Sequence, residues 1–118
     1  MNISKFTQKS VQAVQDLEKV AYEYGNQEIE QEHLLYTLLT QEDSLILKLI
    51  EKMEINKEYF LNTVKNALDA KVKVSGGELR FGQYLNKALV NAEDEAKAMG
   101  DEYVSVEHLF LALLKYPS

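Results

Sequence analysis

The chain contains two histidines, and each one stands between a glutamate and a leucine, in Glu32-His33-Leu34 and Glu107-His108-Leu109. Imidazole and carboxylate groups bind divalent metals, and a carboxylate pair can also carry out acid–base catalysis. Neither motif has the His-x-x-x-His spacing that places two metal ligands on one helix face. Residues that fix the start of a helix explain both motifs more simply, so we expect no catalytic and no metal site.

Composition excludes further kinds of chemistry. The 118 residues include no cysteine, so a disulfide framework, a thiolate metal site and a cysteine nucleophile are excluded. The net charge of −6 disfavours phosphate backbones, so no nucleic-acid partner is expected. Apolar runs stay far below the ~20 residues of a membrane span, and the first residues lack an apolar signal-peptide core. These features predict a cytoplasmic protein without a membrane partner.

Six helices are predicted from apolar residues that recur every three or four positions. They are expected near residues 6–24, 31–39, 45–53, 57–68, 83–99 and 106–116. Asp43 or Ser44 can cap the third helix, and Asn56 can cap the fourth. The apolar residues expected to face the interior include, on the third and fifth helices, Leu45, Ile46, Leu49, Ile50, Met53 and Met99.

The Glu-His-Leu motifs belong to a longer internal repeat. A shift of 75 positions takes His33 to His108 and also pairs Phe6 with Phe81, Gly25 with Gly100 and Ile29 with Val104. The shared unit is a long amphipathic helix, a glycine stop, a short turn with one buried branched residue, and a short leucine-rich helix.

Local sequence explains why a helix starts at the end of each repeated turn. With Ser105 as N-cap, Val104 and Leu109 stand at the two positions of a hydrophobic staple, and Ile29 and Leu34 stand in the same relation around Glu30. Acidic residues follow in the first helical turn, where the helix dipole favours them. The N-cap and staple pattern therefore predicts the same helix start twice.

The predicted fold is all-α, with two pseudo-symmetric helical repeats in a single domain. Residues 1–71 would form the first repeat, residues 72–80 a linker, and residues 81–118 a second repeat truncated after two helices. One repeat cannot easily bury both faces of its short leucine-rich helix, so the two repeats are expected to pack together.

The turn motif at residues 25–35, with its partner at residues 100–110, resembles the N-terminal domain of Clp-type AAA+ chaperones. That domain is built from two copies of a four-helix repeat, and the resemblance covers essentially the whole chain. Residues 39–45 and Ile55-Asn56 are most similar to the ClpB disaggregase branch, with ClpA and ClpC as the alternative. The resemblance implies that ATP and magnesium bind in hexameric AAA+ modules beyond Ser118. This chain has no G-x-x-x-x-G-K-[ST] motif, so we expect it to hold no cofactor and to be no enzyme itself.

The function that the resemblance implies is recruitment of unfolded or aggregated protein, or of an adaptor protein, to an ATP-driven machine. In ClpB-like domains, polar positions at the start of the first helix and around the second repeat's turn are tied to substrate handling. The matching residues are Thr7, Asp101 and Glu107. Each also has a structural reading, as first-turn residue, turn former and helix-dipole partner respectively. Two other functions stay open: an assembly or spacer domain, and the adaptor-binding domain of a ClpC- or ClpA-type protease ATPase subunit.

The truncated second repeat predicts an exposed apolar surface. In the family, the short leucine-rich helix packs against the two helices that follow it, and here none follow. We therefore expect the last helix to be left partly bare and to drive self-association through Leu109, Phe110, Leu113 and Leu114.

Overall fold

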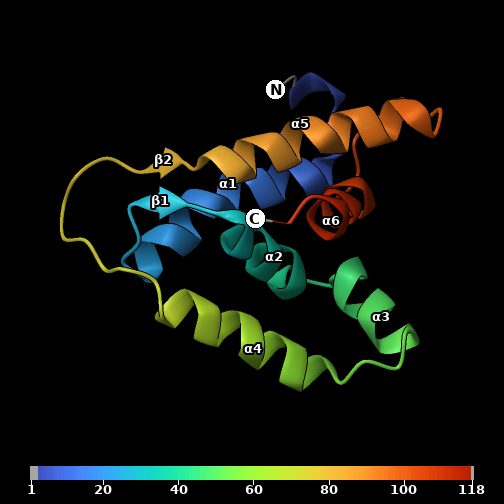
Figure 1. The fold of residues 1–118 in the computed structure, drawn as a ribbon. Helices are drawn as coiled ribbons and strands as arrows, with labels where there is room; N and C mark the ends of the chain where they lie inside the picture. Colours follow the sequence, from blue (N-terminus) through green and yellow to red (C-terminus); the bar gives the residue numbers. More distant parts are fainter. Residues whose placement is uncertain (1–2, 118) are drawn as a thin grey trace.

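A computed structural model describes residues 3–117. These residues form six α-helices, two short strands and a 3-10 turn at Ile3–Lys5 (Figure 1). The helices are α1 Gln8–Glu23, α2 Gln31–Thr40, α3 Leu45–Lys52, α4 Lys57–Asp69, α5 Gln83–Ala98 and α6 Val106–Lys115; the strands are β1 Glu28–Ile29 and β2 Arg80–Phe81. The all-α fold class is confirmed, and no helix within residues 3–117 is long and apolar enough to cross a membrane.

Side-chain caps set the starts of three helices. The Thr7 hydroxyl accepts a hydrogen bond from the Ser10 amide at α1, and the Asn56 side chain accepts one from the Tyr59 amide at α4. Of the two candidates at α3, Ser44 is the cap, while Asp43 adopts the left-handed conformation with φ of 55°. Each cap satisfies a backbone donor that the first helical turn leaves unpaired.

The internal repeat is visible in the element boundaries. The bounds of α5 and α6 are those of α1 and α2 shifted by 75 positions. Gly25 and Gly100 end the long helices with φ of 71° and 73°, a conformation that a side chain would strain. The predicted pair of helix–turn–helix units is therefore confirmed.

The two units exchange backbone contacts in a reciprocal way. The parallel pairs join the turn of one unit to the start of the other: Ile29 with Phe81, and Phe6 with Val104. The Thr7 amide donates to the Val104 carbonyl at 2.9 Å, and the Gly82 amide donates to the Ile29 carbonyl at 2.8 Å. Phe6, expected on the first helix, lies before it and is buried by this exchange.

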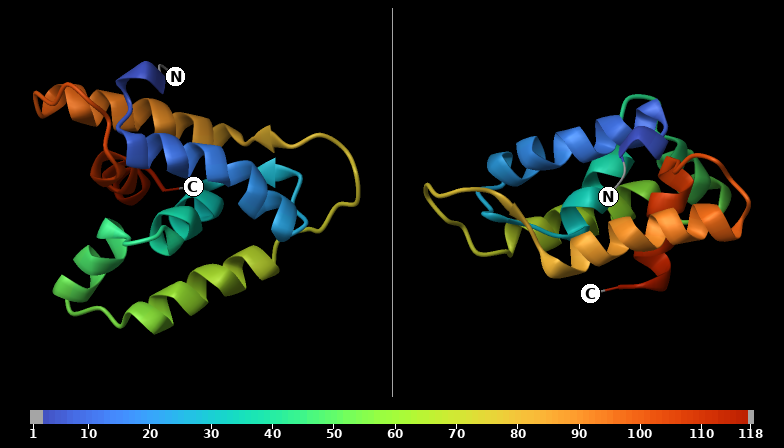
Figure 2. Two further views of the ribbon diagram at one scale, coloured as in Figure 1. Left: turned by 180° about the vertical axis from the view of Figure 1, so that it is seen from behind. Right: turned by 90° about the horizontal axis from the view of Figure 1, so that it is seen from above.

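Helix α2 lies at the centre and contacts α1, α3, α4, α5 and α6. Helices α3 and α4 form an arm on one side of α2, as the front and rear views show (Figures 1 and 2). The core is one apolar cluster drawn from all six helices and both turns. The expected packing of one repeat against the other is thus achieved mainly around α2 and α6.

The expectation of a bare last helix is wrong. Leu109, Phe110 and Leu113 are buried within the chain, and only Leu114, at 58% exposed, fits the expectation. Helix α6 packs against α1, α2, α3 and α5, which together cover most of its apolar face. Most of the apolar surface on which self-association through α6 was predicted is therefore buried within the chain.

Two helices bury fewer residues than predicted. On α3 only Ile46 and Ile50 are buried, because this peripheral helix packs on one side only, and Leu45, Leu49 and Met53 remain exposed. Met99 is also exposed, because it is the C-cap of α5 and no longer follows the helical stripe. Leu45, Leu49 and Met53, which are spaced four residues apart, therefore form an apolar stripe on the outer surface.

Candidate functional site

A groove lies where the starts of α1, α3 and α6 meet. Its volume is about 540 Å³, and its lining residues are Thr7, Gln8, Lys9, Gln41, Asp43, Leu45, Lys48, Ser105, Val106 and Glu107. The α6 residues come from the second repeat and the others come from the first. The groove therefore exists only because the two repeats pack together.

Polar contacts hold the walls of the groove. The Lys9 ammonium donates to the Glu42 carbonyl at 2.6 Å, and the Gln41 side chain donates to the Lys9 carbonyl at 2.9 Å. These bonds fix α1 to the loop that joins α2 and α3. Leu45 is 47% exposed on the α3 wall, while Val106 is buried beneath. A ligand would meet an accessible apolar side chain between charged groups of both signs.

The structure brings two of the three predicted site residues together. Thr7 and Glu107 line the groove from opposite repeats. Asp101 lies elsewhere, beside a separate hollow of about 340 Å³, and its carboxylate accepts a hydrogen bond from the His108 ring at 2.8 Å. Thr7 and Asp101 therefore also hold their own local structure.

Both histidines cap the start of a short helix. The Nδ1 atom of His33 accepts a hydrogen bond from the Glu30 amide at 2.9 Å, and that of His108 accepts one from the Ser105 amide at 2.9 Å. A backbone amide can only donate, so Nδ1 is unprotonated and the proton sits on Nε2. The expectation that these residues fix a helix entry is confirmed.

The second ring nitrogen of each histidine binds the residue just after the glycine stop. Nε2 of His33 donates to the Asn26 Oδ1 atom at 3.0 Å, and Nε2 of His108 donates to Asp101 Oδ2. Both nitrogens of each ring are thus occupied. Within residues 3–117, no cluster of three or more His, Asp or Glu side chains could hold a metal ion.

The environment of His33 strongly favours the neutral ring. Burial, together with the positive charge of Lys71, lowers the pKa of His33 to about 4, although the carboxylates of Glu30 and Glu32 oppose this shift. Protonation at Nδ1 would also place two N–H groups against each other at the Glu30 cap. His33 is therefore a fixed structural element at neutral pH.

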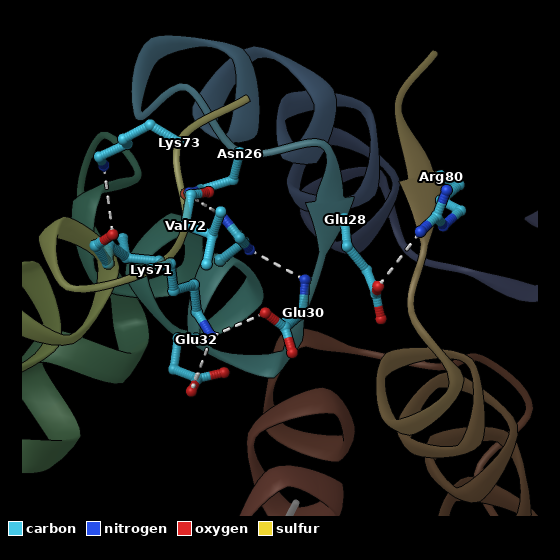
Figure 3. Close-up of polar contacts among 10 residues, drawn as sticks. Asn26, Glu28, Glu30, Glu32, Lys71, Val72, Lys73 and Arg80 are labelled. Carbon is cyan, nitrogen blue, oxygen red and sulfur yellow. Dashed lines mark hydrogen bonds and ion pairs between the residues drawn. The ribbon is translucent and has the colours of Figure 1, made fainter. Parts of the chain in front are cut away.

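The segment 71–74 docks on the turn that His33 holds (Figure 3). The Asn26 side chain donates to the Val72 carbonyl at 3.1 Å, so its amide group links the histidine to this segment. The Val74 amide donates to the Gly25 carbonyl at 2.8 Å. An aspartate at position 26 could not make both bonds, because a carboxylate has no donor.

Two lysines complete the docking. Lys71 Nζ lies 2.8 Å from Glu30 Oε2 and 3.3 Å from Glu32 Oε2 (Figure 3). Lys73 Nζ donates to the Tyr24 carbonyl at 2.5 Å and lies 5.5 Å from the centre of the Tyr24 ring. Sequence reasoning placed Lys71 at the end of the first repeat and residues 72–80 in a plain linker, and no local pattern signals the docking.

Comparison with known proteins supports the resemblance. The family model described as the Clp repeat (R) N-terminal domain matches residues 5–118. The chaperone protein ClpB of Nitratidesulfovibrio vulgaris is 39% identical over all of this chain, which covers 14% of that protein. ClpB of Porphyromonas gingivalis is 40% identical over 97% of this chain, which covers 13% of it. The chain thus spans about one seventh of the curated relatives that it matches.

Solved structures share the fold. The N-terminal domain of Hsp104 from Candida albicans aligns with a TM-score of 0.85 and 21% identity, over 95% of this chain and 75% of that one. The N-terminal domain of the ClpV1 ATPase from E. coli aligns with a TM-score of 0.86 and 22% identity, over 98% of this chain and 71% of that one. With the family model matching almost every residue, the chain belongs to the Clp repeat N-terminal domain family.

Proposed function

We propose that this domain binds segments of unfolded or aggregated polypeptide and presents them to an ATP-driven chaperone of the ClpB type. The observation that carries the proposal is the groove between the repeats, which joins Thr7 and Glu107 to the exposed apolar side chain of Leu45. The ClpB identity of the relatives agrees with it. ATP and magnesium would act in modules outside this chain.

The groove has the physical character that binding of many different sequences requires. Contact between apolar groups is non-directional, so it tolerates variation in the bound segment. The exposed stripe of Leu45, Leu49 and Met53 continues the apolar surface along α3. Charged groups of both signs at the rim, such as Lys9 and Glu107, can orient a chain without demanding one sequence. An adaptor protein with an apolar anchor would use the same surface.

The test measures binding of the complete chain to a reduced, alkylated and therefore permanently unfolded protein. Leu45→Ser removes an apolar side chain that is already half exposed, so the fold should persist while affinity falls about fivefold. The matched control is Tyr22→Ser, which removes a 79% exposed apolar residue far along α1. The control should bind like the unmodified chain.

Three outcomes would count against the proposal. If the two substitutions weaken binding equally, the unfolded protein binds non-specifically to exposed apolar side chains. If Leu45→Ser binds as tightly as the unmodified chain, the groove is not the site. If the unmodified chain shows no saturable binding, a spacer role without a ligand becomes the better account.

A further inference from the structure

Segment 71–74 is held on the first repeat mainly by polar contacts (Figure 3). The Val72 carbonyl accepts from the Asn26 side chain, and the Val74 amide donates to the Gly25 carbonyl. The side chains of Val72 and Val74 are 80% and 42% exposed, so burial of apolar surface contributes little to holding the segment. A segment held in this way can open locally while the core stays folded.

One of these contacts depends on the protonation state of a buried ring. His33 is fully buried, and Asn26 lies between it and the segment. The Asn26 Oδ1 atom accepts from Nε2 of His33 at 3.0 Å, while its Nδ2 atom donates to the Val72 carbonyl at 3.1 Å. Nδ1 of His33 accepts from the Glu30 amide at 2.9 Å. A chain of hydrogen bonds therefore runs from the cap of α2 to the segment.

Protonation of His33 breaks this chain at its first bond. A proton on Nδ1 would face the N–H group of Glu30, which leaves two donors without an acceptor between them. The charged ring can relieve this contact only by turning away, and the turn also takes Nε2 from the Asn26 Oδ1 atom. Asn26 then loses the bond that orients its side chain toward the Val72 carbonyl.

The charges that act on the ring connect it to the segment a second time. Lys71 opposes a positive ring, while Glu30 and Glu32 favour one. Lys71 Nζ lies 2.8 Å from Glu30 Oε2 and 3.3 Å from Glu32 Oε2, so a protonated His33 would repel the residue that anchors the segment. On the turn after α1, burial raises the pKa of Tyr24 to about 12, so its phenol stays neutral in acid.

The chain that follows lets the segment move without its neighbours. Residues 75–78 are all exposed, and Gly76 and Gly77 both adopt positive φ, where glycine carries no steric penalty. Pairing with β1 resumes only at Arg80, whose amide donates to the Gln27 carbonyl at 3.1 Å. The exposed glycine loop can therefore absorb a displacement of segment 71–74 while β2 stays paired.

We infer that segment 71–74 is a strap that acid releases: it lifts from the turn at residues 24–27 when His33 takes up a proton, while the helices stay packed. The hydrogen-bond chain through His33 and Asn26 transmits the protonation to the Val72 carbonyl. Opening would uncover the hollow of about 420 Å³ that the segment lines. This hollow shares no lining residue with the groove, so the inference stands apart from the proposed function.

Hydrogen exchange of the Val74 amide measures how often the strap opens, because this amide is bonded to the Gly25 carbonyl only in the closed form. The pKa of His33 is about 4 in the closed form against an ordinary value of 6.5, so acid favours the open form between these two pH values. After correction for the exchange rate of an unstructured amide, protection of Val74 should fall about 50-fold from pH 7 to pH 4.5.

Urea separates opening of the strap from unfolding of the whole domain. Local opening exposes little surface, so exchange of Val74 should hardly respond to low urea concentrations. The amide of Leu89, a buried residue of α5, should exchange through unfolding and respond strongly. Leu89 should also remain better protected than Val74 at both pH values.

Two matched variants test whether His33 is the group that senses acid. His33→Gln does not titrate and keeps an acceptor for the Glu30 amide, so protection of Val74 should change less than threefold between pH 7 and pH 4.5. His108→Gln makes the same change in the second repeat and should keep the 50-fold effect. If circular dichroism shows that His33→Gln does not fold, the ring signals of the unmodified chain replace it, because loss of Val74 protection must follow the protonation of His33.

The inference is overturned if protection of Val74 in the unmodified chain changes less than threefold over this pH range. It is also overturned if His33→Gln keeps the 50-fold effect, if loss of protection does not follow the His33 ring, or if Val74 exchanges only together with Leu89. None of these results would alter binding of the unfolded protein in the Leu45 experiment at neutral pH.

Discussion

The turns that His33 and His108 hold share one hydrogen-bond arrangement but differ in the residue that accepts from Nε2. Each histidine caps a helix with Nδ1 and reaches back seven residues with Nε2. In the first repeat Nε2 donates to the side-chain amide of Asn26, and in the second it donates to the carboxylate of Asp101. The amide can also donate, so Asn26 fastens segment 71–74 and the turn becomes buried. The carboxylate cannot donate, so Asp101 accepts from His108 and has no amide group to offer a docked carbonyl.

The comparison teaches that the amide or carboxylate at one position decides which groups can lie against a repeated turn. The backbone of both turns is the same, including the glycine stop. The exchange of Nδ2 for an oxygen changes what may lie against the turn, because only a side-chain donor satisfies a docked carbonyl. The two repeats thus share one turn backbone but carry different hydrogen-bonding groups at the same position.

The largest expected difference between the turns comes from deleting each histidine. His33→Ala should lower the free energy of unfolding by about 3 kcal/mol, because it leaves a cavity and unpaired polar groups in a fully buried site. His108→Ala should cost about half as much, since Asp101 regains water and Ser105 can still cap. Urea unfolding of both variants measures this. Equal losses would show that the two turns are equally closed.

Acid should weaken the first turn specifically. The pKa of His33 is about 4 in the folded chain and about 6.5 when unfolded, so the unfolded chain takes up a proton first as pH falls. Stability from this residue is therefore complete above pH 6.5 and is lost between pH 6.5 and 4, by roughly 2–3 kcal/mol.

The control for the acid effect is His33→Gln, which cannot titrate and whose amide can accept from the Glu30 amide as in a capping box. All carboxylates are present in both proteins, so the comparison isolates the contribution of residue 33. The difference in unfolding free energy between the unmodified chain and His33→Gln should therefore fall by roughly 2–3 kcal/mol from pH 7 to pH 4.5. A constant difference would mean that His33 is not held neutral.

Exchanging the partner residues should give the smallest but most specific effects. Asn26→Asp removes the donor to the Val72 carbonyl and should cost about 1–2 kcal/mol at pH 7, with faster proteolysis in residues 72–79. Asp101→Asn keeps its acceptor for His108 and should change stability by less than about 0.5 kcal/mol. The same loss from both substitutions would contradict the assigned role of the Asn26 amide.

The local parts of this structure were predictable from sequence. Ser44, Asn56 and Ser105 as caps, Gly25 and Gly100 as stops, and the repeat itself depend on residues within one or two helical turns, where capping chemistry decides the outcome. The pairing of Thr7 with Glu107 in one groove followed only from the packing of the repeats. Sequence reasoning on the resemblance had named both residues but could not place them together.

The non-local parts were not predictable. The bond from Asn26 to the Val72 carbonyl spans 46 positions, and no pattern around either residue signals it. The burial of Leu109 and Phe110 depends on α1, α2 and α3 as well as α5, so an argument from neighbours within their own repeat gave the wrong answer. The exposure of Leu49 on α3 arises because the amphipathic pattern does not reveal how many sides of a peripheral helix find a partner.

The central claim is that polypeptide binds in the groove between the two repeats, and not at the turn of the first repeat that segment 71–74 covers. Amide chemical-shift mapping with the reduced, alkylated protein as ligand tests it most directly. The account predicts shifts at residues 7–9, 41–48 and 105–107, and little change at residues 24–32. Shifts of equal size at residues 24–32, or confined to them, would contradict it.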